Sequence, residues 1–358
     1  MNPRLTELAG LLPESADAAL IISEANRRYY TNFVSSLGYL FVTRSGAFLI
    51  VDSRYEEAAR SQADGCEVIL MKRLADTMNE LISGQGMKRI MLEASAFTLA
   101  EADIVEKIFV SAGASAVKTG DLDKLISQMR VIKTSAEIDK MRRAQSITED
   151  AFMQTIKLIK EGVTEKELAL ELEFRMRRSG AESVSFDLIV LTGSKTSMPH
   201  GVPDFTKVKY GDFVLFDIGA TYEGYHSDMT RTVALGRVDG VSRRIYETVR
   251  KAQQNALDFV RAGVSCRDVD MKARSYINAA GYEGMFGHST GHGVGIEIHE
   301  APRVSYTNDF ILRSGMVITV EPGIYVPGKC GVRIEDMVVV STDGYINLAS
   351  LPKELIEL

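Results

Sequence analysis

The alternation of apolar and polar positions over roughly the first 120 residues predicts an α/β arrangement. Three short, β-rich apolar runs, at residues 18–22, 38–43 and 46–51, are separated by turn residues and are typical of strands. Three segments with helical spacing follow in the same part of the chain. They are residues 56–63, 74–83 and 99–111. A polar stretch comes next, so we predict a small α/β domain at residues 1–122 and a second domain at 123–358.

The second part of the chain begins with two predicted helices. Thr134 and Glu137 have the spacing of a capping box, in which each side chain bonds the other residue's backbone amide at a helix N-terminus. Apolar residues at helical spacing follow them. Thr164 and Glu167 repeat the pattern, and Gly180 predicts the end of that second helix.

The sequence around the second capping box recurs later in weaker form. Residues 161–168 (EGVTEKEL) match residues 262–269 (AGVSCRDV), and each copy is followed by strand-like runs that hold two acids. These acids are Asp217 and Asp228 in the first copy and Glu321 and Glu335 in the second. We interpret this as an internal duplication of a helix–helix–strand–strand unit. Two such units related by a pseudo-two-fold axis would bring the four acids together at the centre.

An acidic residue within an apolar strand needs a cation or hydrogen-bond donors beside it, because burial of an uncompensated carboxylate is unfavourable in free energy. On its own, Asp217 fits either a metal ligand or a strand-end residue that caps the turn at Gly219. Four acids of this kind cannot all cap turns. With His292, from a glycine-rich segment, they form a set of four carboxylates and one imidazole. We expect Glu335 to lie inside a strand over residues 332–340.

This donor set predicts two divalent cations. Ligands rich in oxygen with a single nitrogen favour Mn²⁺ or Co²⁺, accept Zn²⁺ or Fe²⁺, and argue against a structural zinc site. Two ions about 3.5–4 Å apart lower the pKa of a bridging water and polarise a carbonyl oxygen. The chemistry that follows is hydrolysis of an amide or related bond.

Composition narrows the choice of partners and compartment. The chain has 358 residues with 42 Lys and Arg against 48 Asp and Glu, a net charge of −6 that argues against nucleic-acid or anionic-membrane partners. Cys66, Cys266 and Cys330 lie far apart, which fits a reducing compartment rather than a disulfide framework. No signal peptide or run of about 18 apolar residues is visible. We therefore expect a cytoplasmic protein.

Seven segments in the second part resemble, in their order and spacing, the catalytic domain of the pita-bread metallopeptidases. They are residues 198–201 (MPHG), 216–219 (FDIG), 227–232 (SDMTRT), 288–295 (HSTGHGVG), 298–300 (IHE), 320–325 (VEPGIY) and 332–335 (VRIE). The whole chain resembles the branch of Xaa-Pro dipeptidases (prolidases) and Xaa-Pro aminopeptidases, whose creatinase-like N-terminal domain is similar to residues 28–33 and 52–55. This resemblance implies an α+β fold, with a smaller α/β domain before a duplicated pita-bread domain.

The resemblance also implies roles for individual residues. The metal ligands would be Asp217, Asp228, His292, Glu321 and Glu335. Asp228 and Glu335 would bridge both ions, and Glu321 would also carry the proton of a bridging water, whose hydroxide form is the expected nucleophile.

Further positions are implied around the ligands. His299, together with His200 and His288, would line the substrate site and stabilise the oxyanion. Arg333 would orient Asp217 or the substrate, or form only a salt bridge across its strand. His226 matches no functional position and is expected to be structural or at the surface.

The implied activity is hydrolysis of the bond between an N-terminal residue and proline in a small peptide, by a homodimer. Whether a dipeptide or a longer peptide is cleaved stays open, as do the residue before proline and the physiological metal. The alternatives are a metallo-aminopeptidase without proline specificity, a creatinase-like amidinohydrolase, and a non-catalytic binding protein. The intact ligand set argues against the last two.

Overall fold

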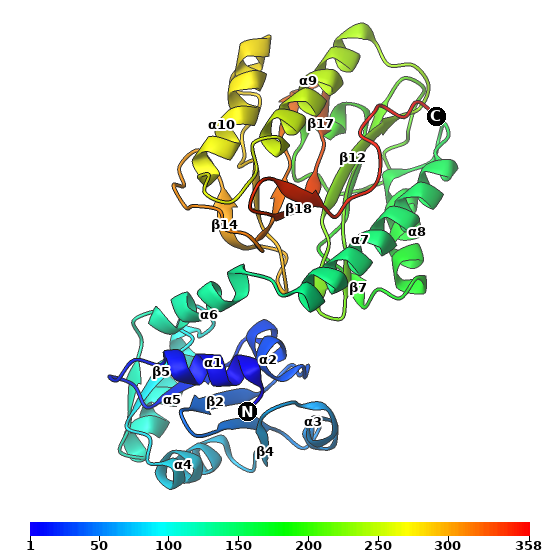
Figure 1. Ribbon diagram of the computed structural model, residues 1–358. Helices are drawn as coiled ribbons and strands as arrows, with labels where there is room; N and C mark the ends of the chain where they lie inside the picture. Colours follow the sequence, from blue (N-terminus) through cyan, green and yellow to red (C-terminus); the bar gives the residue numbers. More distant parts are fainter. The chain divides into compact units, whose positions relative to one another are not determined.

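The computed structural model describes residues 1–358, which form two compact units, residues 1–129 and 130–358 (Figure 1). Helix α6 (Asp121–Val131) spans both this division and the boundary that we predicted after residue 122. Each unit has its own sheets and its own core. None of the helices combines the length and the hydropathy that crossing a membrane requires.

The first unit is built on one six-stranded mixed sheet. Its strands, in the order β4-β3-β2-β1-β5-β6, are β1 (Ala18–Ile21), β2 (Tyr39–Thr43), β3 (Ala47–Val51), β4 (Glu67–Leu70), β5 (Arg89–Leu92) and β6 (Ser115–Val117). The three strands predicted from the apolar runs form β1, β2 and β3, which lie side by side and antiparallel. β1 also pairs with β5 in parallel.

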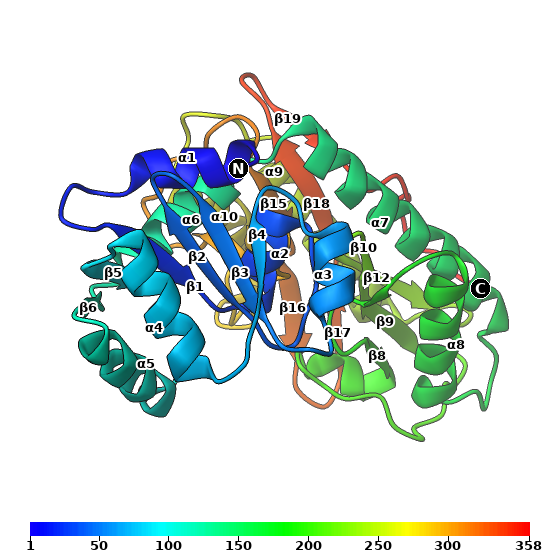
Figure 2. The same cartoon turned by 90° about the horizontal axis from the view of Figure 1, so that it is seen from below.

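Three of the helices of this unit lie close to where the sequence predicted them: α3 (Glu56–Gln62), α4 (Leu74–Gln85) and α5 (Leu99–Ser111). Two further helices, α1 (Pro3–Leu11) and α2 (Glu24–Thr31), were not predicted. α4 and α5 lie together over one face of the sheet (Figure 2), where Met78, Ile82 and Phe109 pack against Leu20 and Phe41.

The second unit contains two helix pairs and four small sheets. Its long helices are α7 (Ser135–Thr155), α8 (Glu165–Arg178), α9 (Gly240–Leu257) and α10 (Cys266–Ile277). Its short helical turns are η1 (Ile156–Leu158), η2 (Gly193–Ser197) and η3 (Asn278–Tyr282). Its strands are β7 (Ser183–Val184), β8 (Ile189–Thr192), β9 (Phe213–Ile218), β10 (Ala220–Tyr222), β11 (Tyr225–His226), β12 (Met229–Ala234), β13 (Gly291–Gly293), β14 (Glu300–Val304), β15 (Val317–Val320), β16 (Gly323–Val326), β17 (Cys330–Arg333), β18 (Asp336–Val340) and β19 (Tyr345–Asn347).

The helices begin where the predicted caps lie. In both α7 and α8 the capping box is formed in full, with Thr134 and Glu137 at the first helix and Thr164 and Glu167 at the second. Gly180 follows the end of α8 with φ +102°, a left-handed conformation that glycine adopts without strain. The prediction of both helices is thus confirmed.

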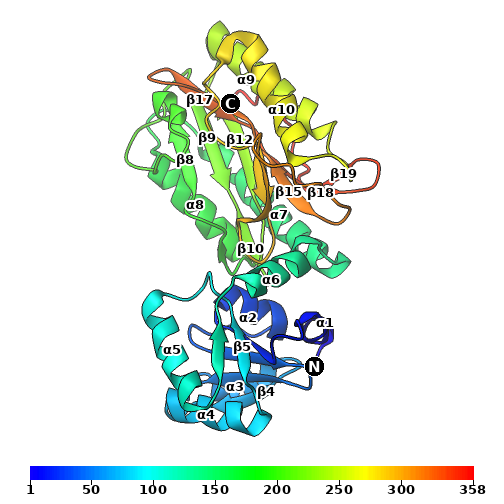
Figure 3. The same ribbon diagram turned by 90° about the vertical axis from the view of Figure 1, so that its left-hand side faces the viewer.

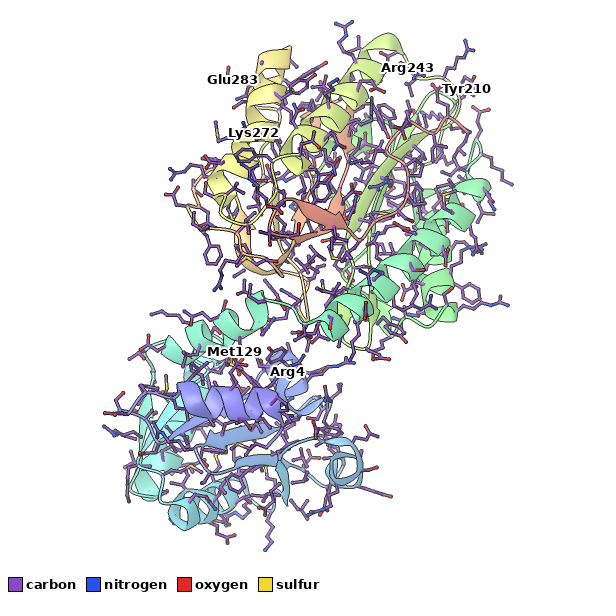
Figure 4. All side chains as sticks on the ribbon, viewed as in Figure 1. Arg4, Met129, Tyr210, Arg243, Lys272 and Glu283 are labelled. Atoms are coloured by element: carbon purple, nitrogen blue, oxygen red, sulfur yellow. The ribbon has the colours of Figure 1, made fainter.

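Each helix pair packs against its own set of strands. α7 and α8 share a core with β8, β9 and β12, whereas α9 and α10 share a second core with β15, β17 and β18. Figures 1 and 3 show these strands between the two helix pairs. The outer faces of α9 and α10 carry exposed charged side chains such as Arg243 and Lys272, which point away from the strands (Figure 4).

The internal duplication is visible in the backbone hydrogen bonding. Thr164, the N-cap of α8, forms an isolated antiparallel bridge with Lys207, and Ser265, the N-cap of α10, forms the same bridge with Ile311. The two caps are 101 positions apart and their two partners 104 (265 − 164 and 311 − 207). The pita-bread fold with its duplicated halves is therefore present, as the sequence predicted.

The core of the first half yields a stability prediction. The buried ring of Phe152 on α7 meets Phe216 edge to face, with centroids 5.4 Å apart. Phe152→Ala should reduce the free energy of unfolding by roughly 3–5 kcal/mol, since it removes buried apolar contacts and leaves a cavity. Phe174→Ala, at an exposed position of α8, should change it by less than about 0.5 kcal/mol. Urea unfolding followed by circular dichroism checks both values, and equal losses would contradict this account of the core.

Candidate metal centre

The duplication places the four acids at matching points of the two halves. Asp217 is the penultimate residue of β9, and Glu321 directly follows β15, 104 positions later (321 − 217). Asp228 directly precedes β12, and Glu335 directly precedes β18. The acids therefore come from equivalent strands of the two halves, which explains how residues so distant in sequence can meet.

One local expectation about these acids is wrong. Glu335 does not lie inside a strand, because β17 ends at Arg333 and β18 begins at Asp336. The Glu335 amide instead donates to the carbonyl of Thr230, at 3.1 Å, and so leaves the strand pairing. This break brings the Glu335 carboxylate to the strand that follows Asp228.

His292 joins the acids from β13. Its Nε2 lies 3.5 Å from an oxygen of Asp228 and 3.5 Å from an oxygen of Glu321. Its Nδ1 lies 3.0 Å from the carbonyl oxygen of Gly293, an arrangement that fixes the ring and turns Nε2 toward the carboxylates. One donor atom each from Asp228, His292 and Glu335 falls within 4.8 Å of the others, the spacing that a shared metal ion requires.

The electrostatics of the cluster fit a cation. Asp228 and Glu335 are almost fully buried, and the Oε1 atom of Glu335 has no hydrogen-bond partner. Burial raises the pKa values of Asp228, Glu321 and Glu335, and in each case the charges of neighbouring carboxylates raise the pKa further. A site that opposes the ionisation of its own carboxylates in this way is suited to positive ions, which remove the repulsion.

Buried hydrogen bonds hold the acids in place. The hydroxyl of Thr230 donates to Oε2 of Glu335 at 2.7 Å, and that of Thr319 donates to Oε1 of Glu321 at 3.2 Å. The guanidinium of Arg333, only 2% exposed, forms an ion pair with the carboxylate of Asp217. Arg333 thus pairs with Asp217, which fits both the expected orienting role and the expected salt bridge between strands.

The cluster opens into a cavity of about 680 Å³, a size typical of small-molecule sites. All three predicted substrate histidines, His200, His288 and His299, line this cavity together with the acids. The ring of His299 stands 4.4 Å from that of His292, centroid to centroid. His226 lies elsewhere, on β11, with Nδ1 3.2 Å from the hydroxyl of Thr221.

This combination of a duplicated fold, a carboxylate cluster and a histidine-lined cavity agrees with what comparison finds. Residues 139–342 match the model of the metallopeptidase family M24. The chain belongs to metallopeptidase family M24. Residues 6–132 match the creatinase/prolidase N-terminal domain. The resemblance to pita-bread metallopeptidases predicted from the sequence is confirmed, and the chain is an enzyme of the metallopeptidase class.

Individual M24 relatives match this chain over nearly its whole length. The uncharacterized peptidase YqhT of Bacillus subtilis is 40% identical over 99% of each chain. The solved structure of an Xaa-Pro dipeptidase from Bacillus anthracis superposes with a TM-score of 0.94, at 38% identity and 99% coverage of both chains. That of an X-Pro aminopeptidase from Thermotoga maritima gives 0.91, at 36% identity, covering 99% of this chain and 100% of the other.

Two groups near the M24 site were not singled out from the sequence. The hydroxyl of Tyr325 lies 2.8 Å from Nε2 of His288 and accepts from Arg333 at 2.7 Å. Tyr325 belongs to a segment that carries the resemblance, so a signal existed. Glu300, next to His299, is held by the side chains of Arg130 and Lys133. Arg130 precedes Glu300 by 170 positions and Lys133 precedes it by 167, and no sequence pattern connects either residue to Glu300.

The environment of His288 yields a prediction about pH. Burial, together with the charge of Arg333, lowers the pKa of His288 to about 3. The unfolded chain binds this proton near pH 6.5, so the free energy of unfolding should fall as the pH drops below that value. At pH 5 the loss is roughly 2 kcal/mol, since each pH unit is worth about 1.4 kcal/mol.

The His288→Asn variant should lack this part of the pH dependence. Urea unfolding between about pH 7.5 and 5 measures it, and the carboxylates titrate in both proteins, so the difference isolates the imidazole. Equal slopes in both proteins would show that His288 is protonated in the folded state.

The ligand cluster yields a prediction about metal binding. Glu335→Gln removes a buried charge from the set and should weaken Mn²⁺ binding by more than the roughly 100-fold that loss of an outer-shell partner can cost. Titration calorimetry on metal-stripped protein measures this. Asp309→Asn, which alters an exposed ion pair with Arg267, should bind as the wild type does. Unchanged affinity in Glu335→Gln would exclude Glu335 as a ligand.

Proposed function

We propose that this M24 enzyme hydrolyses the peptide bond between an N-terminal residue and proline, with two divalent cations held by its carboxylate cluster. The observation that carries the proposal is that Asp228, His292 and Glu335 bring donor atoms within 4.8 Å of one another at a cavity that Asp217, Glu321 and three histidines also line. Further support is the likeness, over 99% of the chain, to proteins named Xaa-Pro dipeptidase and X-Pro aminopeptidase.

The cations would be held by residues from both halves of the duplicated unit. These residues are Asp217, Asp228, His292, Glu321 and Glu335. Mn²⁺ suits a set of four carboxylates and one imidazole, and Co²⁺ or Zn²⁺ would also be accepted. Two such ions supply an activated water at neutral pH and polarise the scissile carbonyl. In this proposal Asp228 and Glu335, the most buried of the acids, would serve as ligands of both ions.

The chain's own side chains would bind the peptide and move its protons. Glu321 lies at the cavity with a raised pKa, which suits a carboxyl group that takes a proton from water and gives it to the leaving amine. His200 and His299 line the same cavity and can donate hydrogen bonds to the developing oxyanion. His288 lines it too, but its ring is neutral, with Nδ1 donating to the carbonyl of Ser289 and Nε2 lying 2.8 Å from the hydroxyl of Tyr325. The expected oxyanion role of His288 is therefore not retained in this proposal, because no N–H of its ring is free. Arg333, bonded to Asp217, keeps that carboxylate in one orientation.

The proposal allows two substrate classes, a dipeptide or a longer peptide. We favour a dipeptide, as in the B. anthracis relative, which is named a dipeptidase. The T. maritima relative is named an aminopeptidase and favours longer peptides as the second candidate. We also propose that the enzyme works as a cytoplasmic homodimer, on the strength of the family resemblance and the three unpaired cysteines.

The experiment compares an Xaa-Pro dipeptide, an Xaa-Pro-Xaa tripeptide, an Xaa-Ala dipeptide and creatine as substrates of metal-stripped protein, before and after Mn²⁺ is added. We expect cleavage of the Xaa-Pro dipeptide only after Mn²⁺ is restored. The Asp228→Ala variant should lose at least about 1,000-fold in activity, whereas Asp309→Asn should keep it.

The other outcomes separate the alternatives. Cleavage of the tripeptide at its first bond identifies an aminopeptidase, and equal turnover of the Xaa-Ala dipeptide removes proline specificity. Turnover of creatine alone would establish the amidinohydrolase. If two ions bind and no substrate is cleaved, the result supports the metal site and contradicts the proposed activity.

A further inference from the structure

A single buried carboxylate ties down both ends of the segment that carries His200. Residues 193–203 follow β8, and Glu165, the first residue of α8, lies fully buried behind them. Its Oε1 accepts a hydrogen bond from the amide of Thr192 at 2.8 Å, just before the segment. Its Oε2 accepts one from the amide of Asp204 at 3.1 Å, just after it. The loop therefore begins and ends on the same side chain.

Lys195 completes this arrangement from inside the loop. Its Nζ donates to Oε2 of Glu165 at 2.5 Å, to the carbonyl of Val202 at 3.1 Å and to the carboxylate of Asp204 at 2.9 Å. A buried carboxylate is tolerated only when charge and hydrogen bonds compensate its lost hydration. Here every donor that compensates the carboxylate belongs to residues 193–203 or to the residues that flank them. The side chain of Glu165 therefore interacts only with this loop and its two ends.

His200 depends on the loop backbone for its position. Its side chain is exposed on the cavity, and no hydrogen bond in the structure holds its ring. The neighbouring Gly201 packs so closely on β8 that a Cβ atom there would come within 2.7 Å of Leu191. Figure 3 shows α8 beside β8, the strand that the loop follows. What fixes the loop thus also fixes the imidazole.

The second half of the duplication shows that this carboxylate is not part of the repeated framework. Ser265 caps α10 as Thr164 caps α8, so the counterpart of Glu165 is Cys266, which offers no charge. The helix and the backbone bridge are formed in both halves all the same. The framework does not need an acid at this point, whereas the loop with His200 uses one.

We propose that Glu165, paired with Lys195, is a positioning residue that fixes His200 in the substrate cavity. The role assigned to His200 rests on the proposed function, whereas the hold on the loop rests on geometry alone. The test therefore has one arm that measures activity and one that does not.

The variant Glu165→Gln keeps the size of the side chain and removes its charge. Its amide group also turns a donor toward the Lys195 ammonium or the Asp204 amide, where an acceptor is needed. The matched control is Glu167→Gln, on the same first turn of α8, because Glu167 bonds only Thr164 of the capping box. Both variants weaken the start of the helix, and only the first releases the loop.

Hydrogen exchange of the folded protein measures the loop directly. We expect the amides of residues 193–204 to exchange at least about 10-fold faster in Glu165→Gln than in the wild type, and at the wild-type rate in Glu167→Gln. Equal acceleration in both variants, or none in Glu165→Gln, would overturn the proposal. This arm decides the hold on the loop even if no Xaa-Pro peptide is cleaved by the wild type.

Activity then tests whether the effect passes through His200. In the wild-type background Glu165→Gln should lower kcat/KM for an Xaa-Pro dipeptide by about 10–100-fold, the effect of a misplaced group near the reacting bond. In a His200→Ala background the same change should lower kcat/KM by less than about threefold, because the group it positions is already gone. Equal losses in the two backgrounds would mean that Glu165 acts through general stability and would exclude the positioning role.

Discussion

Repulsion among carboxylates is the constraint on which the catalytic unit depends. Four acids approach one another in a buried space, where Coulomb repulsion is much stronger than in water. Arg333 is the one guanidinium that pairs with any of these four acids, and the acid with which it pairs is Asp217. A single guanidinium cannot neutralise four carboxylates. Burial, together with this excess of negative charge, raises the pKa values of three of them, and divalent cations would relieve the repulsion.

The duplicated fold explains how the chain tolerates this unfavourable cluster of carboxylates. Each half supplies its acids from paired strands that are anchored by a separate helix pair and a separate core. The carboxylates are therefore held by strands that pack into hydrophobic cores of their own. Hydrogen bonds from Thr230 and Thr319, together with the Arg333 ion pair, then set the direction of each acid. The strands fix the backbone of each acid and the hydrogen bonds fix its carboxylate, so the ligands are preorganised before a metal ion binds.

The sequence was informative where local patterns decide the structure. Both capping boxes, the first three strands and the duplicated halves follow from spacing alone, and the acids stood out because carboxylates rarely interrupt apolar strands. It was misleading at Glu335, where a continuous apolar run concealed the break between β17 and β18. It was silent about Arg130 and Lys133, because ion pairs between residues 170 positions apart leave no local signal. Glu165 was hidden for another reason: at a helix start, a glutamate is ordinary.

The distance between the two halves along the chain has a consequence for folding. Asp217 and Asp228 are synthesised 118 and 107 residues before Glu335 (335 − 217 and 335 − 228), at rates of roughly 5–20 residues per second. For several seconds the first half therefore has its two acids without His292, Glu321 or Glu335 beside them. The repulsion between acids of different halves arises only when the second half docks, so the first half can fold before the full cluster of four carboxylates exists. Duplication thus separates, in time, the formation of the framework from the formation of the charge cluster.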